Sequence, residues 1–406
     1  MAETKGRGQA SSYRRGLIPV LAIVIVWGFI ELIAFVAIKL LKPYGVFYEP
    51  SVSQTYANYL AARDVNLGWG PSRTKTAADG TRIDPIFSAT SQPCVSLFGD
   101  SFTWSEEVAD GDAWGAVLGP KIKCRVANYG VGGYGTDQAY LRFLSLPPVG
   151  GVVFLNHLSE NILRNVNQYR NLLYPGLEFN FKPRFVHQNG ANVLLPIPNI
   201  APNDIQEFLA DPGRYLNNEY FLPGGHAGIQ RITFPYSLAL GKGILWNYRL
   251  HAWSKPSYAD FYRPDHASQG LQVTFGIVDS FAKDAAARGQ IPIVTLIPTC
   301  RDLKYKHEHG VFPYDQLTKM IAEKNIRYID FGVEIERRTR GAPPEQLYHT
   351  CSGHFNAAGY RQLADIAYDF LKDDAQIQQR LAMFPRTVPQ ADERRCSDTT
   401  PPGTSC

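Results

Sequence analysis

Five short apolar stretches alternate with helical patterns between residues 92 and 372, and this alternation constrains the fold more than any other feature. The stretches are rich in β-branched residues and cover residues 94–98, 124–128, 151–156, 291–297 and 326–330. Patterns with helical periodicity cover residues 113–122, 137–146, 275–289, 315–325 and 357–373. Short apolar strands that alternate with helices are typical of a parallel sheet buried on both faces. The sequence therefore predicts an α/β domain over residues 92–372, built on a five-stranded parallel sheet.

Three further segments lie within or beside this domain. Residues 157–290 separate the third predicted strand from the fourth. A structureless loop of that length is improbable in a compact domain, so we expect an insertion that forms a cap or a substrate wall. Residues 43–90 contain turn signals and little periodicity, which indicates a lead-in segment that packs on the domain. The polar residues 373–406 indicate a disordered tail.

A separate apolar segment precedes the domain, at residues 17–38, and Glu31 is its only ionisable residue. About 20 apolar residues are enough to cross the hydrocarbon layer of a membrane. Residues 1–16 are basic, so the segment predicts one transmembrane helix with a cytoplasmic N-terminus and an exported, extracytoplasmic (periplasmic) domain. A cleaved signal peptide is the alternative. The length of the segment and the lack of a small-x-small cleavage site favour an uncleaved anchor.

Placing the Glu31 side chain within hydrocarbon is energetically unfavourable unless it has a partner. Two explanations stay open, tolerance within a long helix and a contact with another membrane protein.

The charge pattern excludes one class of function. Lysine and arginine number 41 and aspartate and glutamate 37, a net charge of +4, and no basic stripe follows the first fifteen residues. Nucleic-acid binding proteins usually carry such a stripe, so no nucleic-acid partner is predicted. Cysteine and histidine show no zinc spacing, and the glycine-rich stretch lacks the spacing of a nucleotide-binding loop. The sequence thus predicts neither a metal nor a cofactor.

Six cysteines are consistent with an exported compartment in which disulfides form. The pairing that we predict is Cys94–Cys124, Cys300–Cys351 and Cys396–Cys406. Its reasons are that the first pair begins two strands that can be neighbours, the second lies at the expected rim of the site, and the third lies in the tail. Six cysteines allow 15 connectivities, so the pairing is a hypothesis.

Candidate site residues follow the predicted strands at their carboxyl ends, where open α/β sheets bind ligands. The first strand runs into GDSFT, which places Ser101 at a tight turn that can present its hydroxyl as a nucleophile. The second runs into NYGVGGYGTDQ, whose glycines, Gly133 among them, allow the backbone to approach a ligand closely. The third leads to Asn161, and His354 opens the last helix in GHFNAAG.

Together these motifs resemble the SGNH hydrolase family, also called GDSL-like, across the whole predicted α/β domain. The resemblance implies a three-layer flavodoxin-like sandwich with strand order 2-1-3-4-5. It implies Ser101 as nucleophile and His354 as general base. It also implies an oxyanion hole formed by the backbone N–H of Gly133 and the side chain of Asn161, with Asn156 as a substitute for the latter.

The sequence departs from the family at the acid that orients the histidine. The family usually has an aspartate two or three residues before it, where this chain has Ser352 and Cys351. Three explanations stay open. A backbone carbonyl orients His354, an acid from another strand end does so, with Asp302 and Asp330 as candidates, or the domain has lost activity.

The predicted function is that of a membrane-anchored, exported serine esterase or acyltransferase. Its substrate would be an ester-linked acyl group, such as an O-acetyl group, on an envelope glycan or lipid. The alternative is a catalytically inactive binding or assembly subunit of an envelope polysaccharide system, built on the same fold.

Overall fold

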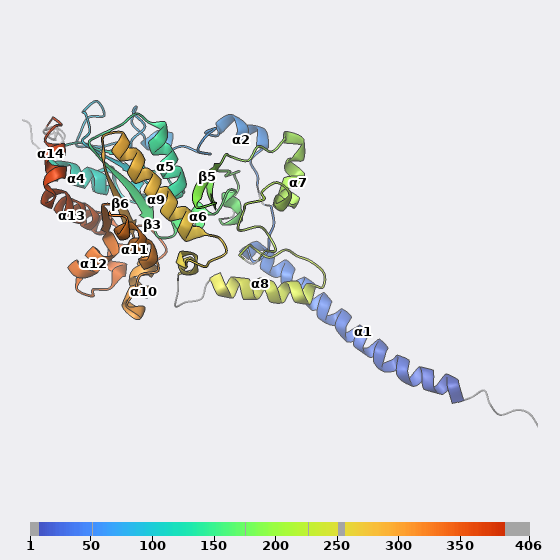
Figure 1. Cartoon of the computed structure of the whole chain (residues 1–406). Coiled ribbons are helices and arrows are strands. Elements are labelled where there is room, and N and C mark those ends of the chain that lie inside the picture. The colour runs from blue at the N-terminus through green and yellow to red at the C-terminus, as the bar shows by residue number, and fades with distance from the viewer. Residues whose placement is uncertain (1–7, 51, 175, 226, 251–255, 386–406) are drawn as a thin grey trace, which may run out of the picture. The chain divides into compact units, whose positions relative to one another are not determined.

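The computed structural model describes residues 8–50, 52–174, 176–225, 227–250 and 256–385 (Figure 1). The chain divides into two compact units, which we describe one at a time. Unit 1 comprises Met1–Ala57, Asn171–Phe179 and Ile200–Ala252, and unit 2 comprises Asn58–Arg170, Asn180–Asn199 and Trp253–Cys406. The predicted pair Cys396–Cys406 lies outside the described residues and stays a prediction.

Unit 2 contains the predicted parallel sheet. Its strands are β1 (Val95–Phe98), β2 (Val126–Asn128), β3 (Val152–Leu158), β6 (Ile291–Ile297) and β7 (Tyr328–Asp330). They lie in the order β2-β1-β3-β6-β7, and every neighbouring pair is parallel. Counted within the sheet this is 2-1-3-4-5, so the predicted fold class is confirmed. The strands β1, β2 and β3 are buried along their whole length, as expected for strands covered on both faces.

Helices cover both faces of this sheet (Figure 1). On one face, α5 (Thr136–Ser145) and α9 (Gly270–Ala287) pack on β3 and on each other. The second layer contains α4 (Trp114–Ile122), α12 (Phe331–Thr339) and α13 (Ala357–Asp373), with α13 in contact with the other two. The remaining helices and strands of unit 2 are α3 (Ser101–Trp104), α6 (Asn161–Asn165), α10 (Cys300–His309), α11 (Asp315–Glu323), α14 (Ala375–Leu381) and the antiparallel hairpin β4 (Arg184–Gln188) and β5 (Ala191–Leu195).

Helix α14 corrects the prediction of a disordered tail from residue 373 onward. Asp374 caps this helix by accepting hydrogen bonds from the backbone N–H groups of Gln376 and Ile377. Ile377 is fully buried, and such burial gives this polar stretch an apolar anchor. The prediction is therefore wrong over residues 374–381, because the cap and the buried Ile377 are joined by side-chain hydrogen bonds of Arg327, Gln378 and Arg380 that hold the helix on the domain.

Two disulfides link parts of unit 2. Cys94–Cys124 joins the residues that precede β1 and β2, and its Cα atoms are 6.0 Å apart. Cys300–Cys351 joins the first residue of α10 to the loop before α13, and its Cα atoms are 5.0 Å apart. Both predicted pairings are thus present in the described part of the chain.

Unit 1 contains α1 (Gly8–Leu41), α7 (Ile205–Ala210) and α8 (Tyr236–Leu250). The boundary between the units falls within α2 (Tyr56–Ala62), after Ala57. The stretch Ile18–Tyr44 contains an 18-residue window with a mean hydropathy of 2.7, and it is the one helix of the described chain that is long and apolar enough to cross a membrane. Helix α1 begins at Gly8, inside the residues that we predicted as a polar N-terminal segment. The helix therefore extends beyond the predicted apolar span of residues 17–38 at both ends.

Glu31 of α1 has its partner within unit 1. Its side chain is buried, with 6% of the residue exposed. One carboxylate oxygen accepts the backbone N–H of Ser237 at 3.2 Å, and the other accepts the Ser237 hydroxyl. The Glu31 carboxylate therefore has a partner within the chain, so its position in the apolar helix no longer calls for a partner protein.

Candidate active site

Ser101 is the first residue of α3 and follows β1 after a sharp turn. A Cβ atom on Gly99 would lie 1.9 Å from the Thr103 hydroxyl oxygen, so only glycine fits the turn. The Asp100 carboxylate caps α3 and accepts the backbone N–H of Phe102 at 2.9 Å. Among the described residues, neither the backbone N–H nor the hydroxyl of Ser101 has a hydrogen-bond partner. Both groups of this serine are thus available to a substrate.

The glycine-rich loop after β2 lies directly against α3. A Cβ atom on Gly130 would be 2.5 Å from the backbone nitrogen of Trp104, and the N–H of Val131 donates to the carbonyl of Gly99 at 3.1 Å. Gly133 has a φ of 78° in the turn that follows, a conformation that favours glycine. Its N–H forms no hydrogen bond within the described part of the chain. The loop that packs on α3 therefore carries one further unpaired donor, the N–H of Gly133.

Asn161 begins α6 immediately after β3 and is fully buried. Its side-chain nitrogen donates to Asp100 at 3.0 Å, which holds the amide beside the start of α3. Asn156, the substitute that we considered, lies inside β3 and accepts a hydrogen bond from the Thr295 hydroxyl at 2.7 Å. Burial raises the pKa of Asp100 above its ordinary value, although the guanidinium of Arg164, 3.5 Å away, acts in the opposite direction. Of the two asparagines, Asn161 is the one beside the serine turn.

His354 lies at the end of a small hairpin that precedes α13. The N–H of His349 donates to the His354 carbonyl at 3.0 Å, and Tyr348 forms a bridge with Phe355. The imidazole ring packs on Phe102, with the ring centres 4.8 Å apart. Because Phe102 directly follows Ser101, the serine turn and the histidine loop converge in the same part of unit 2.

Two glutamates flank the His354 ring, and the sequence reasoning missed both. An oxygen of Glu107 lies 3.5 Å from Nδ1 of His354 and also accepts the backbone N–H of His354 at 3.3 Å. An oxygen of Glu106 lies 3.8 Å from Nε2. Both ring contacts are longer than an ordinary hydrogen bond and are ion pairs in geometry. The signal in the sequence is the pair of acids that follows GDSFTWS, close behind the nucleophile motif.

The loop that carries these glutamates has an unusual backbone. Ser105 and Glu107 have φ values of 64° and 69°, a left-handed conformation that costs a residue with a side chain about 1–3 kcal/mol. Arg82 of the lead-in segment, itself buried, stabilises the loop. Its guanidinium donates to the carbonyl of Ser105 at 2.6 Å, to that of Val108 at 2.9 Å and to that of Trp104. The lead-in thus helps to place Glu107 beside the histidine.

The two aspartates that we predicted as substitute acids lie elsewhere. Asp302 accepts the backbone N–H of Thr299 at 2.7 Å within the cap of α10. Asp330 accepts the N–H of Val333 at 3.1 Å and caps α12. Burial raises the pKa of each to about 6. Within the described residues neither contacts His354, so these carboxylates cap helices rather than orient the histidine.

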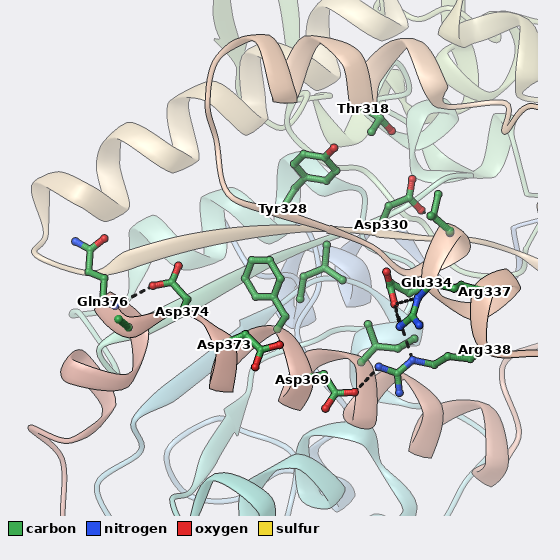
Figure 2. Close-up of a pocket in the computed structure, with 15 residues that line it drawn as sticks. Thr318, Tyr328, Asp330, Glu334, Arg337, Arg338, Asp369, Asp373, Asp374 and Gln376 are labelled. Carbon is green, nitrogen blue, oxygen red and sulfur yellow. Dashed lines mark hydrogen bonds and ion pairs between the residues drawn. The ribbon is translucent and has the colours of Figure 1, made fainter.

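A cavity of about 940 Å³ lies along the edge strand β7, between α11, α12 and α13 (Figure 2). Figure 2 shows Arg338 paired with Asp369 in its wall, at 2.6 Å. Its lining contains neither Ser101 nor His354, so this cavity is separate from the candidate site. In the part of the chain that the structure describes, no group of three or more histidine, cysteine, aspartate or glutamate residues is placed to hold a metal ion.

The sheet order and the site together define a class of protein. A serine after β1, a glycine loop after β2, an asparagine after β3 and a histidine before the last sheet-covering helix have the arrangement of the SGNH hydrolases that the motifs resemble. No family model matches the sequence, and no curated protein matches it.

The solved structures that match the chain include esterases and a lipolytic protein. A lipolytic protein of the G-D-S-L family from Desulfitobacterium hafniense is 14% identical, with a TM-score of 0.33 over 68% of this chain and 98% of that chain. An acetylxylan esterase from Geobacillus stearothermophilus is 12% identical, with a TM-score of 0.34 over 75% and 99%. The esterase EstA from a Pseudoalteromonas species is 11% identical, with a TM-score of 0.31 over 69% and 96%. At these identities and TM-scores, none of these structures assigns a fold or an activity to this chain.

Proposed function

We propose that this chain is a membrane-anchored serine esterase or acyltransferase that acts outside the cytoplasm. The observation that carries the proposal is the packing of the His354 ring on Phe102, the residue next to Ser101, at 4.8 Å. A nucleophile and a base must lie within reach of each other, and residues more than 250 positions apart in the chain meet here.

The proposed reaction begins when His354 takes the proton of the Ser101 hydroxyl. The serine oxygen attacks the carbonyl carbon of an ester, and the negative charge that develops is held by the N–H groups of Ser101 and Gly133 and by the side-chain amide of Asn161. Each donor contributes about 3 kcal/mol to such a transition state. His354 then gives the proton to the departing alcohol. Water, or a sugar or lipid hydroxyl, removes the acyl group from Ser101.

Glu107 takes the role of the missing aspartate in this proposal. It lies against Nδ1 of His354, the nitrogen that does not face the serine in a Ser-His-acid triad. Its contact with the backbone N–H of His354 fixes the carboxylate relative to the histidine loop. The negative charge there favours the imidazolium that forms while the serine attacks.

The proposed location follows from unit 1 and from the disulfides. Helix α1 has the length and apolarity of a membrane anchor, and the chain uses its side chains Glu31 and Ile38 for packing within unit 1. A helix that the fold uses in this way supports an anchor over a removed leader. The disulfides of unit 2 support an oxidising, extracytoplasmic compartment. Ester-linked acyl groups of envelope glycans or lipids are the substrate class within reach of such an enzyme.

A fluorophosphonate label and p-nitrophenyl acetate test the proposal on the full-length protein. We expect the label on Ser101 and loss of turnover in Ser101→Ala and His354→Ala, whereas Ser145→Ala, at an exposed helix end, keeps the wild-type rate. Turnover that persists in both site variants would end the assignment.

One observation favours the second candidate, an inactive binding or assembly subunit. The carboxylate of Glu106 lies 3.8 Å from Nε2 of His354, the nitrogen that has to accept the serine proton. If that contact persists in solution, the histidine is not available as a base. Folded wild-type protein that leaves Ser101 unlabelled, together with a Glu106→Gln variant in which the label attaches, would support the inactive subunit, and a labelled wild type would contradict it.

A further inference from the structure

Helix α8 packs beside α1 within unit 1 (Figure 1). The ring of Phe234, just before α8, lies 5.5 Å from that of Trp27. The ring of Tyr236 lies 5.1 Å from that of Phe35. The start of α8 is therefore level with residues 27–35 of α1.

This level is deep inside the apolar part of α1. Lys39 and Lys42 mark the charged end of that part, and Glu31, which binds Ser237, precedes Lys39 by eight residues. At about 1.5 Å per residue this places Ser237 about 12 Å inside the level of Lys39. Half of a hydrocarbon layer is about 15 Å thick. If α1 spans a membrane, the start of α8 lies near the middle of it.

The two sides of α8 differ in their surroundings. Toward α1, Ala239 is buried in a cluster with Ile38 and Phe47, and a Cβ atom on Gly243 would lie 2.6 Å from the Phe47 ring. The opposite side carries large apolar side chains that are about half exposed or more. These side chains and their exposed fractions are Leu238 56%, Ile244 52%, Leu245 48% and Tyr248 67%. Phe234, which precedes α8 and contacts Trp27, is 61% exposed.

Two polar groups at the start of α8 are paired within unit 1. The N–H and hydroxyl of Ser237 are satisfied by Glu31, so the helix start leaves no polar group of that residue to hydrocarbon. Lys242 follows two residues after Leu240, which packs in the same cluster as Leu41. Lys242 follows Ser237 by five residues, about 7.5 Å along α8, so it lies closer to the level of Lys39 than Ser237 does, and its side chain can extend toward the headgroups.

We propose that residues 234–240, the beginning of α8 included, insert into the lipid bilayer beside α1, with phospholipid acyl chains on their exposed side. The inference rests on the membrane anchoring proposed above. We infer lipid as the molecule that covers this side because the exposed side of α8 continues the exposed apolar surface of α1, where Val20, Ile23 and Ile33 are 59–68% exposed. The protein would then be anchored in the membrane by a second, re-entrant segment as well as by a spanning helix.

Photo-crosslinking in proteoliposomes tests the proposal on the full-length protein. Benzoylphenylalanine replaces Leu238, or Val20 of α1 as the anchor control, or Val311 of unit 2 as the background position. The proteins are reconstituted into palmitoyl-oleoyl-phosphatidylcholine vesicles, irradiated and digested, and lipid adducts are identified by peptide mass spectrometry. We expect adducts at positions 20 and 238, each at least tenfold above the background at position 311.

The possible outcomes separate the two proposals. An adduct at position 20 without one at 238 overturns the insertion of α8 and leaves the anchor standing. No adduct at either position overturns the anchor and, with it, this inference. A crosslink from position 238 to another protein chain instead of lipid overturns lipid as the occupant. A probe at Phe234 repeats the test if the Leu238 replacement does not fold.

Discussion

The role of Glu107 leads to a quantitative prediction for the variant Glu107→Gln. The substitution keeps the shape of the side chain and removes its charge, 3.5 Å from Nδ1 of His354. Two unit charges at that distance attract each other by about 1 kcal/mol in a medium like water and by about 5 kcal/mol at an effective dielectric constant of about 20. Only the transition state contains the charged imidazolium, so the whole difference appears in kcat, as a loss of roughly 5-fold to 5,000-fold. The Glu107 side chain is about half exposed, at 47%, which favours the lower part of that range.

The assay is steady-state hydrolysis of p-nitrophenyl acetate by wild type, Glu107→Gln and a control that removes a charge from the same loop, Asp112→Asn. We expect kcat to fall in Glu107→Gln with KM little changed, because an interaction made only in the transition state is lost. Asp112→Asn should retain wild-type kcat. A Glu107→Gln enzyme within twofold of wild type, in a preparation where Ser101→Ala is inactive, would refute the proposed role.

Two further predictions concern stability and the disulfides. Burial lowers the pKa of His157 from 6.5 to about 3, so the unfolded chain takes up a proton first as the pH falls, and stability is lost between those values. Wild type should lose about 3 kcal/mol relative to His157→Gln between pH 7 and pH 4, measured by chemical unfolding, and equal pH profiles would contradict the burial of a neutral imidazole. Replacing Cys300 and Cys351 by serine opens a loop with a sequence separation of 51 and should cost about 4 kcal/mol of unfolding free energy, similar to the replacement of Cys94 and Cys124, with a separation of 30. Of the two disulfides, only Cys300–Cys351 lies beside the histidine loop. Only its removal should therefore also reduce kcat, at a temperature where both variants are folded. A kcat loss of equal size in the two would show that this bridge has no special effect on the site.

The sequence was sufficient for the sheet and its order. Strands buried on both faces are continuous apolar runs, and these are visible without a structure. The motifs at the strand ends supplied the order by resemblance; Ser101 and Asn161 follow the strands that the sequence predicted for them, and His354 precedes the last predicted helix. These strands and motifs can be predicted from the sequence because each depends on only a few neighbouring residues.

Long-range contacts explain what the sequence did not predict. Glu107 reaches His354 because α3 is one turn long and because Ser105 and Glu107 adopt left-handed backbone conformations. Those conformations depend on Arg82, which lies more than 20 residues earlier in the chain. The sequence also offered no way to find Ser237 as the partner of Glu31, since 206 positions separate them.

That last separation has a consequence for the order of assembly. Bringing the ends of a 206-residue loop together costs about 5 kcal/mol in chain entropy, beyond a constant. The hydrogen bonds of Glu31 alone do not offset that cost, so the docking of α8 on α1 also depends on the ring contacts of Phe234 with Trp27 and of Tyr236 with Phe35. The chain is synthesised from its N-terminus, so Ser237 is made after β1, β2 and β3, which lie between residues 95 and 158. Until then the carboxylate of Glu31, in the middle of the apolar helix, is without its serine.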